Sequence, residues 1–262
     1  MKAFKKHLRR GFLLSALFFS INTDTRAHEK YYATANPELS LRQGPGTQSP
    51  VLTKIPYGSP LVPVNNSNDT GSYKQVVVGG LPGYWKKVKY KEATGYVIDA
   101  YVSPAAPPKA GTKDLPSYAA QVSRTFGNKL TTGKAPTQIA EGGEVVDRQL
   151  YQNGMVYTKV TGYEYMAETL QFPAANIATV YNLLRNIDEF GPVLKTNNDL
   201  KEGEHTTKDS KGNVYTWKVA YEKENGVNWL QSIKINWEEG GYYNLEVRAL
   251  ETEVIVTYSN GV

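Results

Sequence analysis

Few side chains in this sequence can perform nucleophilic or metal chemistry. The 262 residues include no cysteine, which excludes a thiol nucleophile, a disulfide framework and a cysteine-ligated metal. Of the three histidines, His7 and His28 lie near the N-terminus, and only His205 belongs to the body of the chain. A histidine-dependent catalytic triad would have to use His205, but the surrounding LKEGEHTTKDSKG is typical of a charged, solvated loop. We therefore expect no metal and no cofactor.

Paired carboxylates are the enzymatic chemistry that remains. Glu164 and Glu168 are four positions apart and would share one face of a strand, and Glu238–Glu239 flank a turn signal. A glycosidase uses two carboxylates about 5–9 Å apart. No acid, however, has the conspicuously apolar surroundings that tune a catalytic carboxyl group. We expect that the protein is not an enzyme, and a cell-wall hydrolase with paired carboxylates remains an alternative.

The elements that would position any site fall into two bodies. Short apolar runs separated by turn signals fill residues 31–103, a spacing that predicts a small all-β barrel. Residues 104–116 are rich in proline and indicate a semi-rigid extended linker, across which we expect few contacts. A second domain then occupies residues 117–262, and we expect the two domains to fold independently.

The first body contains the motifs LSLRQGPGTQSPVLTKIPYG, GYWKKV and TGYVIDAYV. In these motifs it resembles the bacterial SH3 domain, with Ser40 where the family usually has Asn and an insertion of about ten residues around 65–83. The resemblance covers about residues 31–103 and implies an SH3-like barrel. Members of this family commonly hold cell-wall peptides, glycans or other proteins, so the resemblance implies a binding module.

A ligand-binding surface on this barrel is predicted from one strand. Side chains alternate along Trp85-Lys86-Lys87-Val88, so a core Val88 places Trp85 on the outer side. Tyr101 lies in DAYV, similar to the Ser-Asn-Tyr-Val ending of eukaryotic SH3 domains, where this Tyr and a Trp line the peptide groove. We expect Trp85 and Tyr101, with Tyr84 and Asp99 nearby, to form an exposed aromatic platform. The alternative is that the 65–83 segment folds over Trp85 and buries it.

The second domain is predicted to be α+β, an antiparallel sheet of five or more strands with one main helix. Asn153-Gly154 predicts a hairpin turn between strands 145–151 and 155–160, and a further strand is expected over 163–172. The apolar period within 173–190 predicts a helix that opens at Pro173 and ends at Gly191-Pro192. Four more strands are expected over 214–221, 227–237, 242–250 and 253–258. Residues 117–143 have no assignment.

The passage ETLQFPAANIATVYNLLRNIDEF resembles the opening of START-like lipid-binding domains, although the long C-terminal helix of that family has no counterpart before Val262. That resemblance implies an apolar pocket for a lipid or small apolar ligand. Aromatic residues also crowd the final strands, where they either form the core beneath the helix or a concave surface for sugar or lipid. They are Trp217, Tyr221, Trp229, Trp237, Tyr242 and Tyr243.

The first 27 residues have the pattern of a secretory signal peptide. Five Lys and Arg residues precede the apolar stretch 11–21, and Ala27 is the expected cleavage position. An uncleaved membrane anchor is the alternative, although the apolar stretch is short for a membrane span. Cleavage would remove six of the 30 basic residues and one of the 25 acidic ones. The net charge of the remainder is then near zero, so a nucleic-acid partner has no electrostatic support.

Together these patterns predict an exported, periplasmic or secreted protein without a transmembrane span after cleavage. Its fold class is an all-β SH3-like barrel followed by an α+β domain. We expect a non-enzymatic binding protein that takes a cell-wall peptide, a glycan or a protein partner on the barrel. A lipid or small-molecule carrier that uses the second domain is the alternative from a different class.

Overall fold

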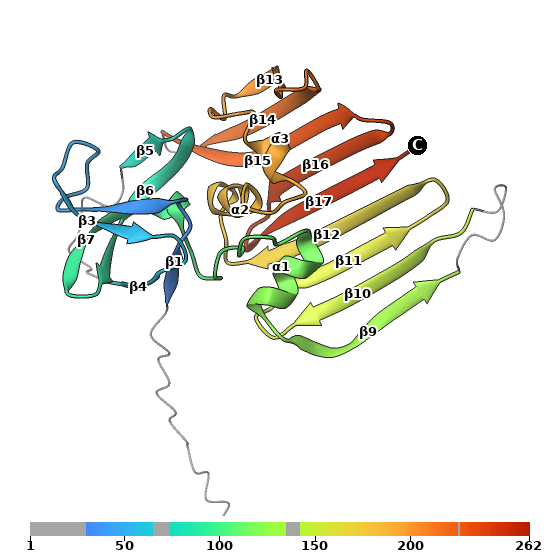
Figure 1. Ribbon diagram of the computed structural model, residues 1–262, viewed down its shortest axis with the longest axis horizontal. Helices are drawn as coiled ribbons and strands as arrows, with labels where there is room; N and C mark the ends of the chain where they lie inside the picture. Colours follow the sequence, from blue (N-terminus) through green and yellow to red (C-terminus); the bar gives the residue numbers. More distant parts are fainter. Residues whose placement is uncertain (1–29, 65–73, 135–141, 225) are drawn as a thin grey trace, which may run out of the picture.

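The computed structural model describes residues 30–64, 74–134, 142–224 and 226–262. These residues form two antiparallel sheets, one in a small N-terminal barrel and one in a larger second domain, with three short α-helices (Figure 1). The expected signal peptide 1–27 and residues 65–73 of the 65–83 insertion lie outside the described residues. The protein is therefore mostly β, and the second domain is richer in sheet than expected.

The barrel sheet follows the order β3-β2-β7-β6-β4-β1-β8, and β5 pairs with β6. Side chains alternate in direction along its strands, and those that face inward form a small core that includes Leu41, Ile55, Val88 and Val97. The elements are β1 (Tyr31–Ala33), β2 (Glu38–Arg42), β3 (Val51–Pro56), β4 (Pro60–Pro63), β5 (Gln75–Val78), β6 (Leu81–Tyr90), β7 (Ala93–Ile98), the 3-10 helix η2 (Asp99–Tyr101) and β8 (Val102–Ser103).

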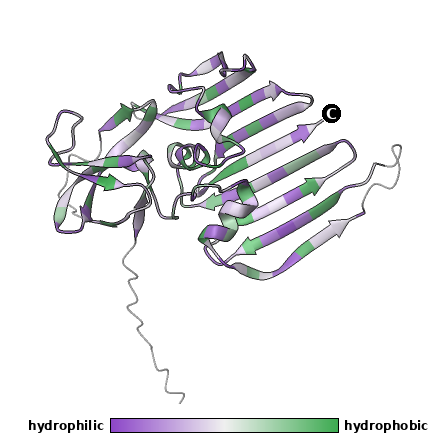
Figure 2. Ribbon diagram, in the orientation of Figure 1, coloured by the Kyte–Doolittle hydropathy of each residue, from purple (hydrophilic) through white to green (hydrophobic). Residues whose placement is uncertain are grey.

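The second sheet has nine strands in the order β13-β14-β15-β16-β17-β12-β11-β10-β9. β17 lies in the interior of the sheet between β16 and β12. It therefore joins the strands of the first half of the domain, β9 to β12, to those of the second half, β13 to β16. The strands are β9 (Thr125–Gly133), β10 (Val145–Tyr151), β11 (Val156–Thr161), β12 (Tyr165–Pro173), β13 (Gly203–Lys208), β14 (Val214–Glu224), β15 (Val227–Glu238), β16 (Tyr242–Ala249) and β17 (Glu253–Gly261). Hydropathy alternates along many of these strands (Figure 2).

The helices lie against one face of the large sheet (Figure 1). They are α1 (Leu115–Val122), α2 (Ile177–Leu184) and α3 (Gly191–Leu194). The prediction of a helix over 173–190 was wrong at both ends. Asn176 caps α2 by accepting the Thr179 N–H, and Pro173 ends β12 instead. Gly191-Pro192 begins α3, because proline fits the first turn of a helix.

Two segments differ from their sequence-based interpretation. Residues 117–143, which had no assignment, contain most of α1 and the edge strand β9. His205 lies in β13, the opposite edge strand, and not in a loop. Its ring stacks on Trp217 at a centroid distance of 6.2 Å, and its Nε2 is 3.0 Å from Nδ2 of Asn197. The histidine therefore packs and hydrogen-bonds within the protein.

The space between α2 and the sheet is filled by side chains. Tyr181 and Leu184 of α2 are 1% and 0% exposed, and Trp217 beneath them is 0% exposed. Trp237 is also buried, which confirms the core interpretation for these two tryptophans. Trp229 and Tyr242, in contrast, are 44% and 51% exposed. The aromatic residues of the final strands thus divide between core and surface.

The barrel and the second domain share an apolar core. Leu81, Ile98 and Ala100 of the barrel belong to the same buried cluster as Ala178 and Val180 of α2. The expectation that few contacts cross the linker was therefore wrong. The physical reason is that the barrel places apolar side chains on its outer side as well as inside, and α2 covers them.

Hydrogen bonds reinforce this junction. Asn182 in α2 is buried and donates from Nδ2 to the carbonyl and the hydroxyl of Thr34, at 2.9 and 2.8 Å. The linker is also fixed, because the Tyr57 hydroxyl of the barrel donates to the Pro108 carbonyl and the Tyr118 hydroxyl of α1 donates to the Ala106 carbonyl. Buried polar groups paired in this way resist separation of the two parts.

Candidate functional site: two pockets on and beside the barrel

Trp85 points away from the barrel core, as its spacing from Val88 predicted. Val88 belongs to the barrel core, whereas Trp85 belongs to the cluster shared with the second domain. Trp85 is only 3% exposed, so the prediction of an exposed platform was wrong for this residue. Val78 of β5 packs against the same cluster, in partial agreement with the alternative that the inserted segment covers Trp85.

Trp85 and Tyr101 nevertheless come together at one pocket of about 200 Å³, which we call the barrel groove. Ile98 lies with them, and the Tyr101 hydroxyl donates to the Val78 carbonyl at 2.7 Å. The remaining lining residues come mainly from β2 and from the loop after it. They are Ala35, Glu38, Leu39, Ser40, Arg42, Thr47 and Val78. An apolar floor thus meets a polar wall.

The wall of the groove carries both signs of charge. Glu38 forms an exposed ion pair with Lys54 at 3.3 Å, which contributes little and leaves the carboxylate open to other partners. Arg42 donates from Nη1 to the Ser49 carbonyl at 2.8 Å, and this bond fixes the loop that follows β2. Sequence analysis quoted Arg42 as part of the family pattern but did not place it, or Glu38, in the site.

Tyr84 and Asp99 do not join that groove. They line a second pocket of about 210 Å³ between the barrel and the second domain, which we call the junction pocket. There the Tyr84 ring lies 5.8 Å from the Trp229 ring, and Asp99 Oδ1 accepts the Tyr84 N–H at 2.8 Å. The four predicted residues are therefore divided between two sites, because neighbouring residues of β6 face opposite sides.

Burial alters the pKa of Asp99. Loss of hydration raises the pKa of this carboxyl above its ordinary value, while the Tyr84 N–H and the nearby Lys86 act in the opposite direction. Gly83 allows the carboxylate to lie this close to β6, since a Cβ atom at Gly83 would be 2.5 Å from Oδ1. The junction pocket thus presents a positioned carboxylate beside two aromatic rings.

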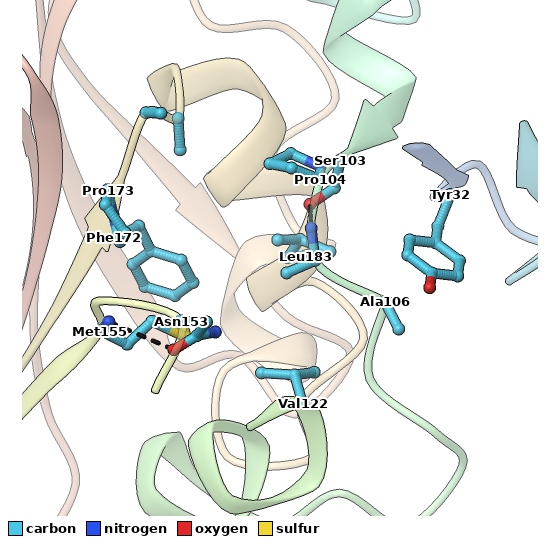
Figure 3. A pocket seen from close by; sticks show the side chains of 13 residues that line it. Tyr32, Ser103, Pro104, Ala106, Val122, Asn153, Met155, Phe172, Pro173 and Leu183 are labelled. Atoms are coloured by element: carbon cyan, nitrogen blue, oxygen red, sulfur yellow. Dashed lines mark hydrogen bonds between the residues drawn. The ribbon is translucent and has the colours of Figure 1, made fainter. Parts of the chain in front are cut away.

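A third pocket of about 390 Å³ lies where the barrel, the linker and the second domain meet (Figure 3). Phe172, Met155 and Leu183 give it an apolar lining, and Tyr32 contributes from the barrel. The pocket lies at the junction, whereas the carrier hypothesis placed its ligand inside the second domain. There, buried side chains fill the space between α2 and the sheet.

The structure separates the first of the two predicted carboxylate pairs and leaves the second exposed. Glu164 lies before β12 in a left-handed conformation with φ 59°, so it does not share a strand face with Glu168. Glu168 is 6% exposed and pairs with Lys159 at 3.2 Å. Glu238 and Glu239 are both exposed at the end of β15. In the described ranges, no three His, Asp or Glu side chains are grouped so that they could hold a metal ion.

Comparison with known proteins identifies the first body. Residues 37–103 match the family model described as Bacterial SH3 domain, so the barrel is a bacterial SH3 domain, as its sequence motifs indicated. Searches of curated proteins and of solved structures found no match to the chain. Within the described residues, no helix is long and apolar enough to cross a membrane.

Proposed function

We propose that this protein is an exported, non-enzymatic binding protein whose SH3 barrel binds short cell-wall peptides in the barrel groove. The family match supports a binding module, typically one related to the cell wall. The sequence of residues 1–27 supports export, since a basic start precedes an apolar stretch. A folded protein partner on the same groove is the competing form of this proposal.

The observation that carries the proposal is the composition of the groove. Trp85 and Ile98 offer an apolar floor, while Glu38 and Arg42 offer one charge of each sign on the same face of β2. A short peptide with a free amine and a free carboxylate is the complementary ligand. Most ligand pockets combine an apolar lining with a few polar groups in this way.

The test compares two variants that lose the same charge. Arg42→Gln removes a cation from the groove, whereas Lys89→Gln removes an exposed cation of β6 outside it. Full-length proteins are titrated with soluble peptides released from purified wall. We expect about tenfold weaker binding for Arg42→Gln, equivalent to about 1.4 kcal/mol, and unchanged binding for Lys89→Gln.

Equal loss in the two variants would mean that binding follows overall charge and not the groove. The wild-type protein could fail to bind peptide but capture a folded protein that Arg42→Gln does not capture. That result would show that the groove binds a protein partner and would overturn the peptide assignment.

A further inference from the structure

The junction pocket contains an exposed tryptophan, Trp229, that does not line the barrel groove. Trp229 is 44% exposed, whereas the other three tryptophans, Trp85, Trp217 and Trp237, are 3%, 0% and 8% exposed. A large apolar ring left in water beside a second ring, Tyr84, is typical of a ligand-contact surface. The two ring planes are inclined by 37°, so they form a shallow angle and do not cover one another fully.

The polar groups of this pocket are suited to a ligand with many hydroxyl groups. Asp99 is the charged residue in its lining, and no lysine, arginine or histidine is among the residues that line it. A carboxylate accepts hydrogen bonds from hydroxyl groups and repels anions. Asn176 also lines the pocket and uses its Oδ1 to cap α2, so its amide nitrogen is available to donate.

We propose that the junction pocket is a saccharide-binding subsite that takes one sugar ring of a neutral oligosaccharide. The C–H face of a pyranose ring packs on Trp229 and Tyr84 through dispersion contacts. Its hydroxyl groups donate to Asp99 and accept from Asn176. This subsite does not use the barrel groove, so it stands independently of the proposed peptide binding.

The two parts of the protein hold this subsite in a fixed geometry. Gln75 of β5 donates from Nε2 to the Asn228 carbonyl at 2.6 Å, next to Trp229. On the other side, the Thr179 hydroxyl of α2 donates to the Asp99 carbonyl at 3.2 Å. Because Tyr84 and Asp99 come from the barrel and Trp229 from the second sheet, neither part contains the subsite alone. Preformed geometry lowers the entropic cost of binding.

Fluorescence gives a specific test, because Trp229 is the tryptophan most accessible to a neutral quencher. The full-length protein is titrated with chitotriose, cellotriose and maltotriose, and acrylamide quenching is measured with and without each sugar. We expect at least one sugar to reduce quenching. Calorimetry with that sugar should show at least tenfold weaker binding for Trp229→Ala and several-fold weaker binding for Asp99→Asn, which keeps the acceptor for Tyr84.

Two controls make the assignment falsifiable. Tyr242→Ala removes another exposed aromatic ring of the second sheet outside the junction pocket, and Arg42→Gln alters the barrel groove; both should bind the sugar as the wild type does. Failure of all three sugars to protect Trp229 would overturn the subsite. So would unchanged affinity in Trp229→Ala, or an equal loss in Tyr242→Ala.

Discussion

At the scale of single residues, Glu189 has an unusual environment for a carboxyl group. Its Oε2 atom is buried, and within the described part of the chain it has no hydrogen-bond partner. The pKa of this carboxyl is raised from 4.5 to about 7, chiefly by burial and in addition by the nearby Glu168 and Asp114. A hydrogen bond from Tyr258 and the charge of Lys159 act against the shift.

This raised pKa predicts a pH-dependent stability. Because the folded protein holds the proton more tightly than the unfolded chain, the contribution of Glu189 is fully present below about pH 4.5 and is lost as the pH rises through about 7. The carboxyl is partly exposed, so solvent screening limits the loss to about 1–2 kcal/mol. Urea unfolding at pH 5, 6, 7 and 8 should show this decline, and Glu189→Gln should remove it.

The exposed Glu238 provides the matched control, since Glu238→Gln changes the same charge and should keep the decline. A decline of the same size in Glu189→Gln would assign the pH dependence to other groups.

At the scale of elements, the turn between β5 and β6 holds the barrel against the second domain. Gly80 has φ +78°, and a Cβ atom there would be 2.1 Å from the backbone oxygen of Asn198. The turn thus touches the loop before β13 at a distance that only glycine permits.

Substitution of this glycine should cost more than backbone strain alone. Gly111 has nearly the same conformation, with φ +80°, but nothing lies within 4 Å of its Cβ position. We expect Gly111→Ala to lower the free energy of unfolding by about 1 kcal/mol and Gly80→Ala by about 3 kcal/mol, since the latter must also move backbone atoms. Denaturant unfolding measures both. Equal losses would show that the turn does not press on the second domain.

At the scale of the whole molecule, the shared core makes the barrel and the second domain one cooperative unit. Trp85 from the barrel and Trp217 from the second sheet lie in the same buried cluster, and the linker accepts hydrogen bonds from both parts. Separation would expose apolar surface on both parts and would leave Asn182 without Thr34.

We therefore expect a single urea transition for the full-length chain, in which tryptophan fluorescence and far-ultraviolet circular dichroism coincide. As a second measurement, a protease site inserted at the exposed residues 109–111 allows the linker to be cut in the folded protein. The two fragments should then co-elute on size exclusion. Two resolved transitions, or fragments that separate without denaturant, would contradict a shared core.

The sequence allowed much of this architecture to be predicted, because the relevant signals are local. Alternation and turn residues located the barrel and the strands from β14 to β17, and a period of two gave the direction of Trp85. The edge strands β9 and β13 were not predicted, because both are largely polar and exposed. The burial of Trp85 and the meeting of Tyr84 with Trp229 depend on partners far along the chain, for which no local pattern exists.

The interior position of β17 has a consequence for the order of events during synthesis. This strand is the last in sequence, yet it joins β16 on one side to β12 on the other. Until residues 253–261 have emerged, the meander β9–β12 and the meander β13–β16 each have an open edge where β17 will insert. The large sheet of a growing chain therefore becomes continuous only after β17 has been synthesised, because β17 is the strand that joins its two halves.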